Sequence, residues 1–211
     1  MASKFGVPAT YDIDSFLSQV EMDVVSVLTP SGMHPAHAIS CAKAGKHVMV
    51  EKPMSPRLED AEAMIRAWDE AGVKLFVVRQ NRFNIPVLKA REALDAGRFG
   101  RQILGAVRVR WCRDQAYYDQ DKWRGTCAYD GGVLSNQASH HIDLLEWFFG
   151  DVEIAHARAI TALSRIEMED TAIATLKFRN CALGLIEGTT AIRPSDLEGS
   201  LSILGENGVV S

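Results

Sequence analysis

The sequence predicts an α/β segment followed by an α+β segment: a partial parallel sheet with helices on its faces, then a larger and mainly antiparallel sheet. In the first 80 residues, short apolar runs alternate with amphipathic helical stretches, which is the pattern of β-α-β units. Beyond Asn81, strands follow one another with few helices between them, which is typical of antiparallel sheets. We therefore expect one domain over residues 1–80 and a second over residues 81–211.

Three strands and two helices are expected in the first domain. Gly45 and Gly72 each follow a helical stretch and are suited to end it. The predicted strands cover 23–29, 47–51 and 74–79, and the predicted helices cover 34–44 and 58–71. Each β-α-β crossover is expected to be right-handed.

The second domain begins with a helix over 86–96 and a strand over 103–112, in which apolar residues alternate. A helix over 136–149 follows, and then strands over 154–162, 171–178, 183–189 and 200–204. Asn207-Gly208 is typical of a hairpin turn.

Both ends of the chain look incomplete. Three strands make a small parallel sheet, and the Gly-x-Gly-x-x-Gly turn that seats a dinucleotide pyrophosphate does not occur in the chain. We therefore expect a Rossmann-type domain without its first β-α-β unit and a second domain that is truncated at its C-terminal side. A small complete domain with irregular ends is the alternative.

The composition of the chain narrows the classes of function that the protein can have. The chain has 47% hydrophobic and 24% charged residues and a net charge of −4, which do not favour nucleic-acid binding. No apolar run is long enough to cross a membrane and the start does not resemble a signal peptide, so we expect a cytoplasmic protein without a membrane partner. The four cysteines form no CxxC pair, and no metal site is predicted: His140 with Asp143 or His37 lacks a convincing third ligand.

Lys52 stands where the second predicted strand ends, in the segment AGKHVMVEKP. Ligands of open parallel sheets bind beyond the carboxyl ends of the strands, so a lysine there can reach a ligand and take part in proton transfer. Pro53 restricts the backbone and makes a cis peptide plausible. The alternative is an ordinary surface loop. The turn after the first strand, which begins at Thr29, opens a helix and could face a phosphate or ribose.

A second polar segment, DGGVLSNQASHHID, precedes and enters the predicted helix 136–149. Asn136, His140 and Asp143 are spaced to share one helical face, and three polar groups there are costly to bury without a partner. This spacing predicts a polar site. A capped helix with a satisfied histidine is the alternative.

Two loops could hold substrate. Arg79 and Asn81 lie at the end of the third strand. Arginine forks match carboxylate and phosphate oxygens, although a solvated domain junction would look the same. A polar, aromatic loop follows the strand 103–112; its candidate binding residues are Tyr117, Lys122, Trp123 and Arg124.

The segments TPSGMHPAHAISCAKAGKHVMVEKPM and WRGTCAYDGGVLSNQASHHIDLLEWFFG together resemble the Gfo/Idh/MocA family of NAD(P)-dependent oxidoreductases. The resemblance implies that Lys52 is the catalytic lysine near the nicotinamide and that His140 is the acid/base candidate. It also implies cofactor contacts on one side of the site, at Thr29, Pro30, His34, Glu51 and Lys52. Asn136 stands where the family usually has aspartate, and Ala138 where it usually has glycine.

Within that family, NRFNIPVLKAREALDAGRFG and VRVRWCRDQAYYDQDKWRGT look most like dehydrogenases that oxidise carbon 3 of UDP-N-acetylglucosaminuronic acid for surface polysaccharides. The implied cofactor is NAD, with NADP left open. The implied substrate-binding residues are Arg79, Asn81, Tyr117, Lys122, Trp123, Arg124, Asn136 and His140.

Two alternatives stay open at this point: a relative that cleaves glycosides through transient oxidation, and a catalytically inactive fragment. Without the glycine-rich turn, we expect this chain to be weakly active at most. The resemblance also implies a homo-oligomer formed through the C-terminal sheet, and the apolar alternation of Ile103 to Trp111 fits such a surface.

Overall fold

The computed structural model describes residues 2–19 and 21–211. The chain forms two compact units, Met1–Val78 and Arg79–Ser211. In the described part of the chain, none of the helices has the length and apolar character needed to cross a membrane.

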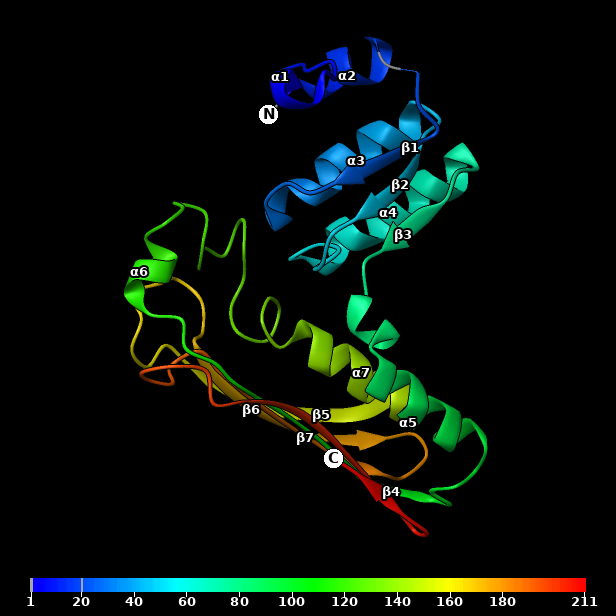
Figure 1. Ribbon diagram of the computed structural model, residues 1–211, viewed down its shortest axis with the longest axis vertical. Coiled ribbons are helices and arrows are strands. Elements are labelled where there is room, and N and C mark those ends of the chain that lie inside the picture. Colours follow the sequence, from blue (N-terminus) through cyan, green and yellow to red (C-terminus); the bar gives the residue numbers. More distant parts are fainter. Residues whose placement is uncertain (1, 20) are drawn as a thin grey trace. The chain divides into compact units, whose positions relative to one another are not determined.

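The first unit is built on a three-stranded parallel sheet in the order β1-β2-β3 (Figure 1). Its strands are β1 (Val24–Val27), β2 (His47–Val50) and β3 (Leu75–Val77). The helices are α1 (Ala2–Phe5), α2 (Ile13–Gln19), α3 (His34–Lys43) and α4 (Leu58–Ala71), with a 3-10 turn η1 (Ser31–Met33) before α3. Helix α4 ends at Gly72, whose φ of 65° is a left-handed conformation that favours glycine.

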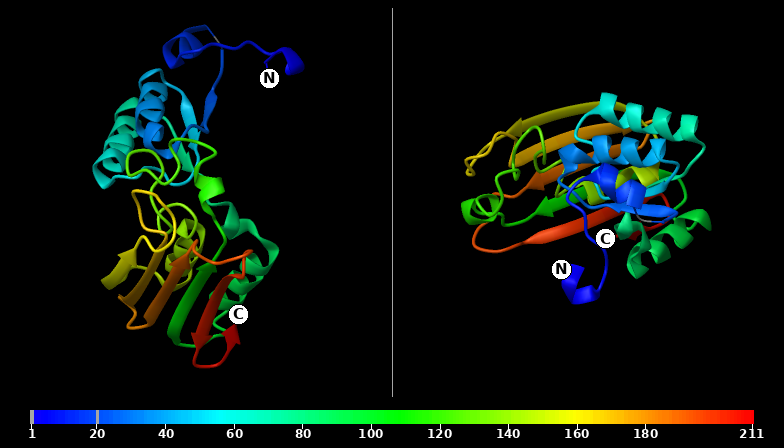
Figure 2. Two further views of the ribbon diagram at one scale, coloured as in Figure 1. Left: turned by 90° about the vertical axis from the view of Figure 1, so that its left-hand side faces the viewer. Right: turned by 90° about the horizontal axis from the view of Figure 1, so that it is seen from above.

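Every second side chain of β1 and β2 is buried, and these side chains all lie on one face of the sheet. Val25, Val27, Val48 and Val50 form one core cluster with side chains of α3 and α4. The intervening side chains are more exposed, with Phe76 of β3 at 53%. Helices α3 and α4 therefore cover the same face of the sheet, as Figure 2 also shows.

The second unit holds a six-stranded sheet in the order β5-β6-β7-β4-β8-β9. Its strands are β4 (Gln102–Arg110), β5 (Val152–Ile160), β6 (Thr171–Phe178), β7 (Leu183–Thr189), β8 (Glu198–Gly205) and β9 (Val209–Val210). The β4 and β7 strands are parallel, and all other neighbours are antiparallel. The helical elements are η2 (Gln80–Phe83), α5 (Ile85–Asp95), α6 (Gln115–Tyr118) and α7 (Ser139–Phe149).

Helices α5 and α7 lie on one face of this sheet (Figure 1). The core there joins Val107 of β4, Leu145 and Phe149 of α7, and Phe178 of β6. Gly105 allows the close approach of α7, because a Cβ at this position would lie 2.5 Å from the Phe149 ring and 2.6 Å from the Leu145 side chain. A small residue in β4 is therefore part of the helix–sheet packing.

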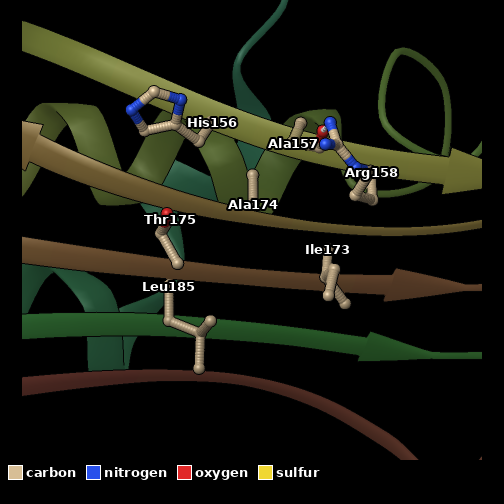
Figure 3. Close-up of a pocket in the computed structure, with 7 residues that line it drawn as sticks. All are labelled: His156, Ala157, Arg158, Ile173, Ala174, Thr175 and Leu185. Carbon is tan, nitrogen blue, oxygen red and sulfur yellow. Dashed lines mark hydrogen bonds between the residues drawn. The ribbon is translucent and has the colours of Figure 1, made fainter.

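Among the described residues, no helix covers the opposite face of this sheet. Apolar side chains are exposed there, with Ile173 at 55%. A shallow hollow of about 430 Å³ lies over β5, β6 and β7 and is bordered by His156, Arg158 and Leu185 (Figure 3). On β4, Arg110 forms hydrogen bonds of 2.6 and 2.8 Å with Glu187 of β7.

These elements confirm the predicted fold class: a Rossmann-like parallel sheet followed by a larger, mainly antiparallel sheet. Two predictions about the second unit were wrong. The helix predicted from 136 begins at Ser139, because residues 131–138 form turns in which the Val133 N–H donates to the Glu169 carbonyl. The apolar alternation of β4 does not make an association surface either, since Val107 faces the core.

Candidate functional site

In the first unit, the predicted cofactor residues lie just beyond the carboxyl ends of β1 and β2. Thr29 and Pro30 follow β1, and Glu51 and Lys52 follow β2. Parallel pairing of these strands places both ends at the same edge of the sheet. The fold therefore gathers at one edge residues that are 22 positions apart in the chain, as the sequence predicted.

His34 connects the two loops at this edge. Its Nε2 lies 2.8 Å from the Thr29 carbonyl oxygen, and its Nδ1 lies 2.8 Å from the Pro53 carbonyl oxygen. The side chain is 1% exposed. Both ring nitrogens thus face the backbone of this unit, and His34 joins the two loops at this edge; its predicted cofactor contact stays a prediction.

The segment around Lys52 has a defined backbone. The Lys52–Pro53 peptide bond is cis, and the Lys52 N–H donates to the Glu51 carboxylate at 3.1 Å. The Thr29 hydroxyl lies 3.2 Å from Nδ1 of His37. A hollow of about 640 Å³ runs along β1 and includes Thr29 and His37 in its lining. Thr29 is the predicted cofactor residue that borders this hollow.

In the second unit, His140 lies in the first turn of α7 and is 9% exposed. The amide nitrogen of Gln80, in η2, lies 3.3 Å from its Nε2. Sequence reasoning placed Gln80 in a ligand-side loop but did not select it. The pairing spans 60 residues, and no local spacing signals it.

Arg79 and Arg82 each form an ion pair with Asp143, inside the second unit. Arg82 binds Asp143 through a two-bond fork, both bonds 2.8 Å long, and Arg79 Nε lies 2.9 Å from the same carboxylate. Asp143 is only 11% exposed. The loop was predicted to recognise an anionic substrate. Asp143 supplies one negative charge to two guanidiniums, so it does not neutralise both arginines, and the predicted role stays a prediction. Asn81, predicted beside it, is half-buried.

Asn136 does not share a helical face with His140 and Asp143, contrary to the prediction. It lies in the turn before α7, where its side-chain amide donates to the Asp130 carboxylate. Asp130 is 1% exposed and also accepts the Gly125 N–H at 2.6 Å. The side chain of Asn136 is thus directed to the buried Asp130, in the turn before α7, and does not join the helix face of His140 and Asp143.

Three of the predicted substrate-binding residues, Tyr117, Trp123 and Arg124, contact one another. Arg124 donates to the Tyr117 hydroxyl at 2.7 Å, and its guanidinium lies 4.6 Å from the Tyr117 ring centroid and 4.9 Å from that of Trp123. Lys122 is exposed beside them. These contacts preorganise the loop, because each ring packs against the same cation.

A hollow of about 580 Å³ adjoins this loop and is lined by Lys122 and Arg124. The loop between β5 and β6 adds Arg165 and Glu167 to the lining. Sequence reasoning missed both residues, because they reach the hollow from about 40 positions away. The lining therefore combines cations and carboxylates from two loops, a polar surface suited to a polar ligand.

Burial shifts the pKa of two other titratable groups, His141 and Cys41. Burial lowers the pKa of His141, which packs edge-on against Trp111 at 5.9 Å between ring centroids. Burial raises the pKa of the Cys41 thiol to about 11. In the part of the chain that the structure describes, no three His, Cys, Asp or Glu side chains are grouped to hold a metal ion.

Comparison with known proteins assigns both units to one family. Residues 1–79 match the profile described as oxidoreductase family, NAD-binding Rossmann fold. Residues 87–211 match the profile described as GFO/IDH/MocA C-terminal domain. The chain is also 31% identical to the myo-inositol 2-dehydrogenase of Thermotoga maritima over 195 residues, which are 90% of this chain and 56% of that protein.

Two solved structures are similar over 99% of this chain, each with a TM-score of 0.96. One is the WlbA dehydrogenase of Bordetella pertussis, at 46% identity, and the other is that of Chromobacterium violaceum, at 44%. Both were solved with NADH and UDP-GlcNAcA, and this chain covers 62% and 60% of them. It spans between a third and somewhat over half of the first curated relatives. The chain belongs to the GFO/IDH/MocA family of oxidoreductases.

Proposed function

We propose that this protein is an NAD-dependent dehydrogenase that oxidises a secondary alcohol of a sugar, namely carbon 3 of UDP-N-acetylglucosaminuronic acid, in the synthesis of surface polysaccharides. The observation that carries the proposal is the 46% identity and TM-score of 0.96 to a dehydrogenase solved with NADH and UDP-GlcNAcA. We place the reaction in the cytoplasm, where NAD and nucleotide sugars are available together.

The first unit fits part of an NAD site. Thr29 and Lys52 lie at the edge of the parallel sheet where ligands of such sheets bind, with Pro30 and Glu51 beside them. A hydroxyl and an ammonium group can bind the ribose and carboxamide parts of the cofactor. The described residues do not include a glycine-rich turn for the pyrophosphate. Bound NAD would supply the nicotinamide that accepts the hydride.

Proton transfer falls to Lys52 and His140 in this proposal. When the carbon–hydrogen bond breaks and its electron pair leaves as hydride, the hydroxyl proton must move to a base. One of these two groups takes the proton, and the other holds the hydroxyl or stabilises the developing charge. Asn136 is a neutral amide bound to Asp130, so it holds the turn before α7 rather than acting as a base.

The second unit would bind the nucleotide sugar. Lys122 and Arg124 line the hollow of about 580 Å³ and are cations of the kind that bind a diphosphate or uronate, with Arg124 also held by Asp121 at 3.0 Å. Tyr117 and Trp123 hold the Arg124 guanidinium between them. We assign substrate binding to this loop, together with Asn81 and with Arg79 as a residue that is held by Asp143.

We also propose that the protein forms a homo-oligomer through the uncovered face of the six-stranded sheet. Exposed apolar side chains of β5 and β6, among them Ile160 and Ile173, support this assignment. The hollow of Figure 3 and the Arg110–Glu187 pair lie on strands of the same sheet. Ile173→Arg should convert the oligomer to monomer in light scattering, and an unchanged mass would contradict the proposal.

Calorimetry tests the binding part of the proposal. Purified protein would be titrated with NAD and with UDP-N-acetylglucosaminuronic acid, separately and together, and compared with Lys52→Ala. Lys43→Ala is the matched control, because Lys43 is an exposed lysine in the last turn of α3. Sugar binding without NAD binding would support a substrate site on the second unit alone, whereas no binding of either ligand would favour the inactive-fragment alternative.

Product analysis separates the remaining alternatives. A keto sugar formed together with NADH supports the dehydrogenase. Release of a free sugar without net formation of NADH would instead support the glycoside-cleaving alternative. Loss of turnover in Lys52→Ala with retained sugar binding would support the chemical role of that lysine.

A further inference from the structure

In the hydrogen bond between Gln80 and His140, the types of the two atoms decide which one donates and which one accepts. The two nitrogens lie 3.3 Å apart, one in the side-chain amide of Gln80 and the other at Nε2 of the imidazole. An amide nitrogen carries two hydrogens and only donates, so Nε2 of His140 must accept. The neutral ring therefore carries its proton on Nδ1.

Gln80 is mostly exposed, but its backbone is anchored on both sides. Arg79, immediately before it, and Arg82, two positions after it, both bind Asp143 of α7. Asp143 follows His140 by three residues, which is about one helical turn. The Arg82 guanidinium also lies 5.2 Å from the ring centroid of Trp147, one turn further along α7. The η2 turn is thus attached to the same helix that presents the histidine.

We propose that Gln80 is a positioning residue that holds the His140 ring in the tautomer whose Nε2 accepts a hydrogen bond, ready to take a proton from a substrate hydroxyl. This inference rests on the proposed function for the proton that His140 would receive. Gln80 acts before the substrate hydroxyl arrives, because both bind the same atom: the hydroxyl then takes the place of the Gln80 amide at Nε2, the oxygen–hydrogen bond breaks, and a nitrogen–hydrogen bond forms at Nε2. The carbon becomes a carbonyl as it loses a hydride, which bound NAD would accept.

Gln80→Met leaves the charge around the histidine unchanged, whereas Gln80→Glu adds one negative charge. The charged groups that η2 and α7 bring together next to this contact are Asp143 and its two arginines, Arg79 and Arg82. Gln80→Met keeps the length of the side chain but cannot donate. Gln80→Glu presents a carboxylate, which only accepts and therefore favours a proton on Nε2.

Gln102 provides matched controls. Its amide also donates to α7, at 2.8 Å to the Phe148 carbonyl oxygen, but at the opposite end of the helix from His140. Gln102→Met and Gln102→Glu therefore remove a glutamine bond to α7 without touching the histidine. Any effect that comes only from a looser α7 should appear in both pairs of variants.

Nitrogen NMR of protein labelled at histidine reports the tautomer directly and needs no ligand. The His140 signals are assigned by their loss in His140→Gln and, independently, by contacts of the ring with the Gln80 amide protons. We expect the proton on Nδ1 in the wild type, and a drop of about fivefold in the tautomer ratio in Gln80→Met, which corresponds to one ordinary hydrogen bond. We expect the proton on Nε2 in Gln80→Glu.

Three NMR results would overturn the inference: a wild-type ring protonated on Nε2, the same spectrum in the wild type and both Gln80 variants, or a change of equal size in the Gln102 variants. Turnover gives a second readout, in which Gln80→Met should lower kcat and leave KM nearly unchanged; a rise in KM alone would contradict positioning. Because the NMR measurement needs neither NAD nor sugar, failure of the proposed function would appear separately, in the calorimetry.

Discussion

Asp170 holds the β5–β6 loop, and its replacement by asparagine should destabilise the second unit. The carboxylate is fully buried. One oxygen accepts the Ala162 N–H at 2.7 Å and the Thr171 hydroxyl at 3.0 Å. The other accepts the N–H groups of Leu163 and Ser164 at 2.8 and 2.9 Å. In Asp170→Asn, one of these acceptors becomes an NH2 group that faces donors.

The size of the loss in the free energy of unfolding follows from replacing an acceptor with a donor at this position. If the amide oxygen keeps the Ala162 and Thr171 bonds, the Leu163 and Ser164 N–H groups lose their acceptor. A buried donor without a partner costs about 1–3 kcal/mol. Leu163 as a whole residue is 62% exposed and its N–H bond to Asp170 is only part-buried, so water can partly replace that acceptor. We therefore expect the free energy of unfolding to fall by about 3 kcal/mol.

Urea unfolding followed by circular dichroism measures this change, and hydrogen exchange of residues 162–164 locates it. Asp151→Asn is the control, because Asp151 is exposed and lies 3.7 Å from an exposed arginine. That variant should change stability by less than about 0.5 kcal/mol. A loss below about 1 kcal/mol in Asp170→Asn, or unchanged exchange at Leu163 and Ser164, would refute the reasoning.

The same site predicts an acid dependence. Burial alone would raise the pKa of Asp170, but its backbone donors and the Thr171 hydroxyl outweigh burial and hold the pKa below its ordinary value of 3.8. A carboxyl group with a lowered pKa in the folded state contributes stability above its unfolded pKa, and that contribution is lost as the pH falls through the folded pKa. Wild type should therefore lose more stability than Asp170→Asn on acidification, and parallel pH profiles would contradict this.

Three further predictions concern packing and reactivity. Arg82→Met and Asp143→Asn should couple by about 1.5 kcal/mol in a double-mutant cycle, because the two side chains share a fork of two bonds; additive effects would contradict this. Gly105→Ala should lower stability by about 2 kcal/mol, since its Cβ would lie 2.5 Å from a ring of α7; an unchanged urea midpoint would argue against that packing. Burial raises the pKa of Cys41 to about 11, so a thiol reagent should modify exposed Cys127 and spare Cys41 in the folded protein, whereas equal rates would refute this.

Local patterns predicted the three strands and the helices α3 and α4 of the first unit and the last hairpin of the second, but not α1 and α2. The helix predicted over 58–71 is α4, and Gly72 ends it with a left-handed φ of 65°. The hairpin predicted at Asn207-Gly208 joins β8 to β9. Such features depend on the conformational preferences of neighbouring residues, so a single stretch of sequence is enough to predict them.

Strand order and the buried faces could not be predicted in this way. The β4 strand pairs in parallel with β7, about 80 positions later, and in antiparallel fashion with β8. The alternating valines of β4 predicted that one face of the strand is apolar. The pattern does not say which element covers that face. Packing of α7 on Val107 made it the core.

Sequence by itself determined the two sheets, the family resemblance, and the candidate pair Lys52 and His140, because these depend on local periodicity and on motifs with fixed spacing. Only the tertiary structure decided what the candidates touch. It placed Gln80 at His140 and bound Arg79 to Asp143, and it moved Asn136 out of the helix towards Asp130. The first two contacts join residues about 60 positions apart, and hydrogen bonds of that kind are decided by how the elements pack.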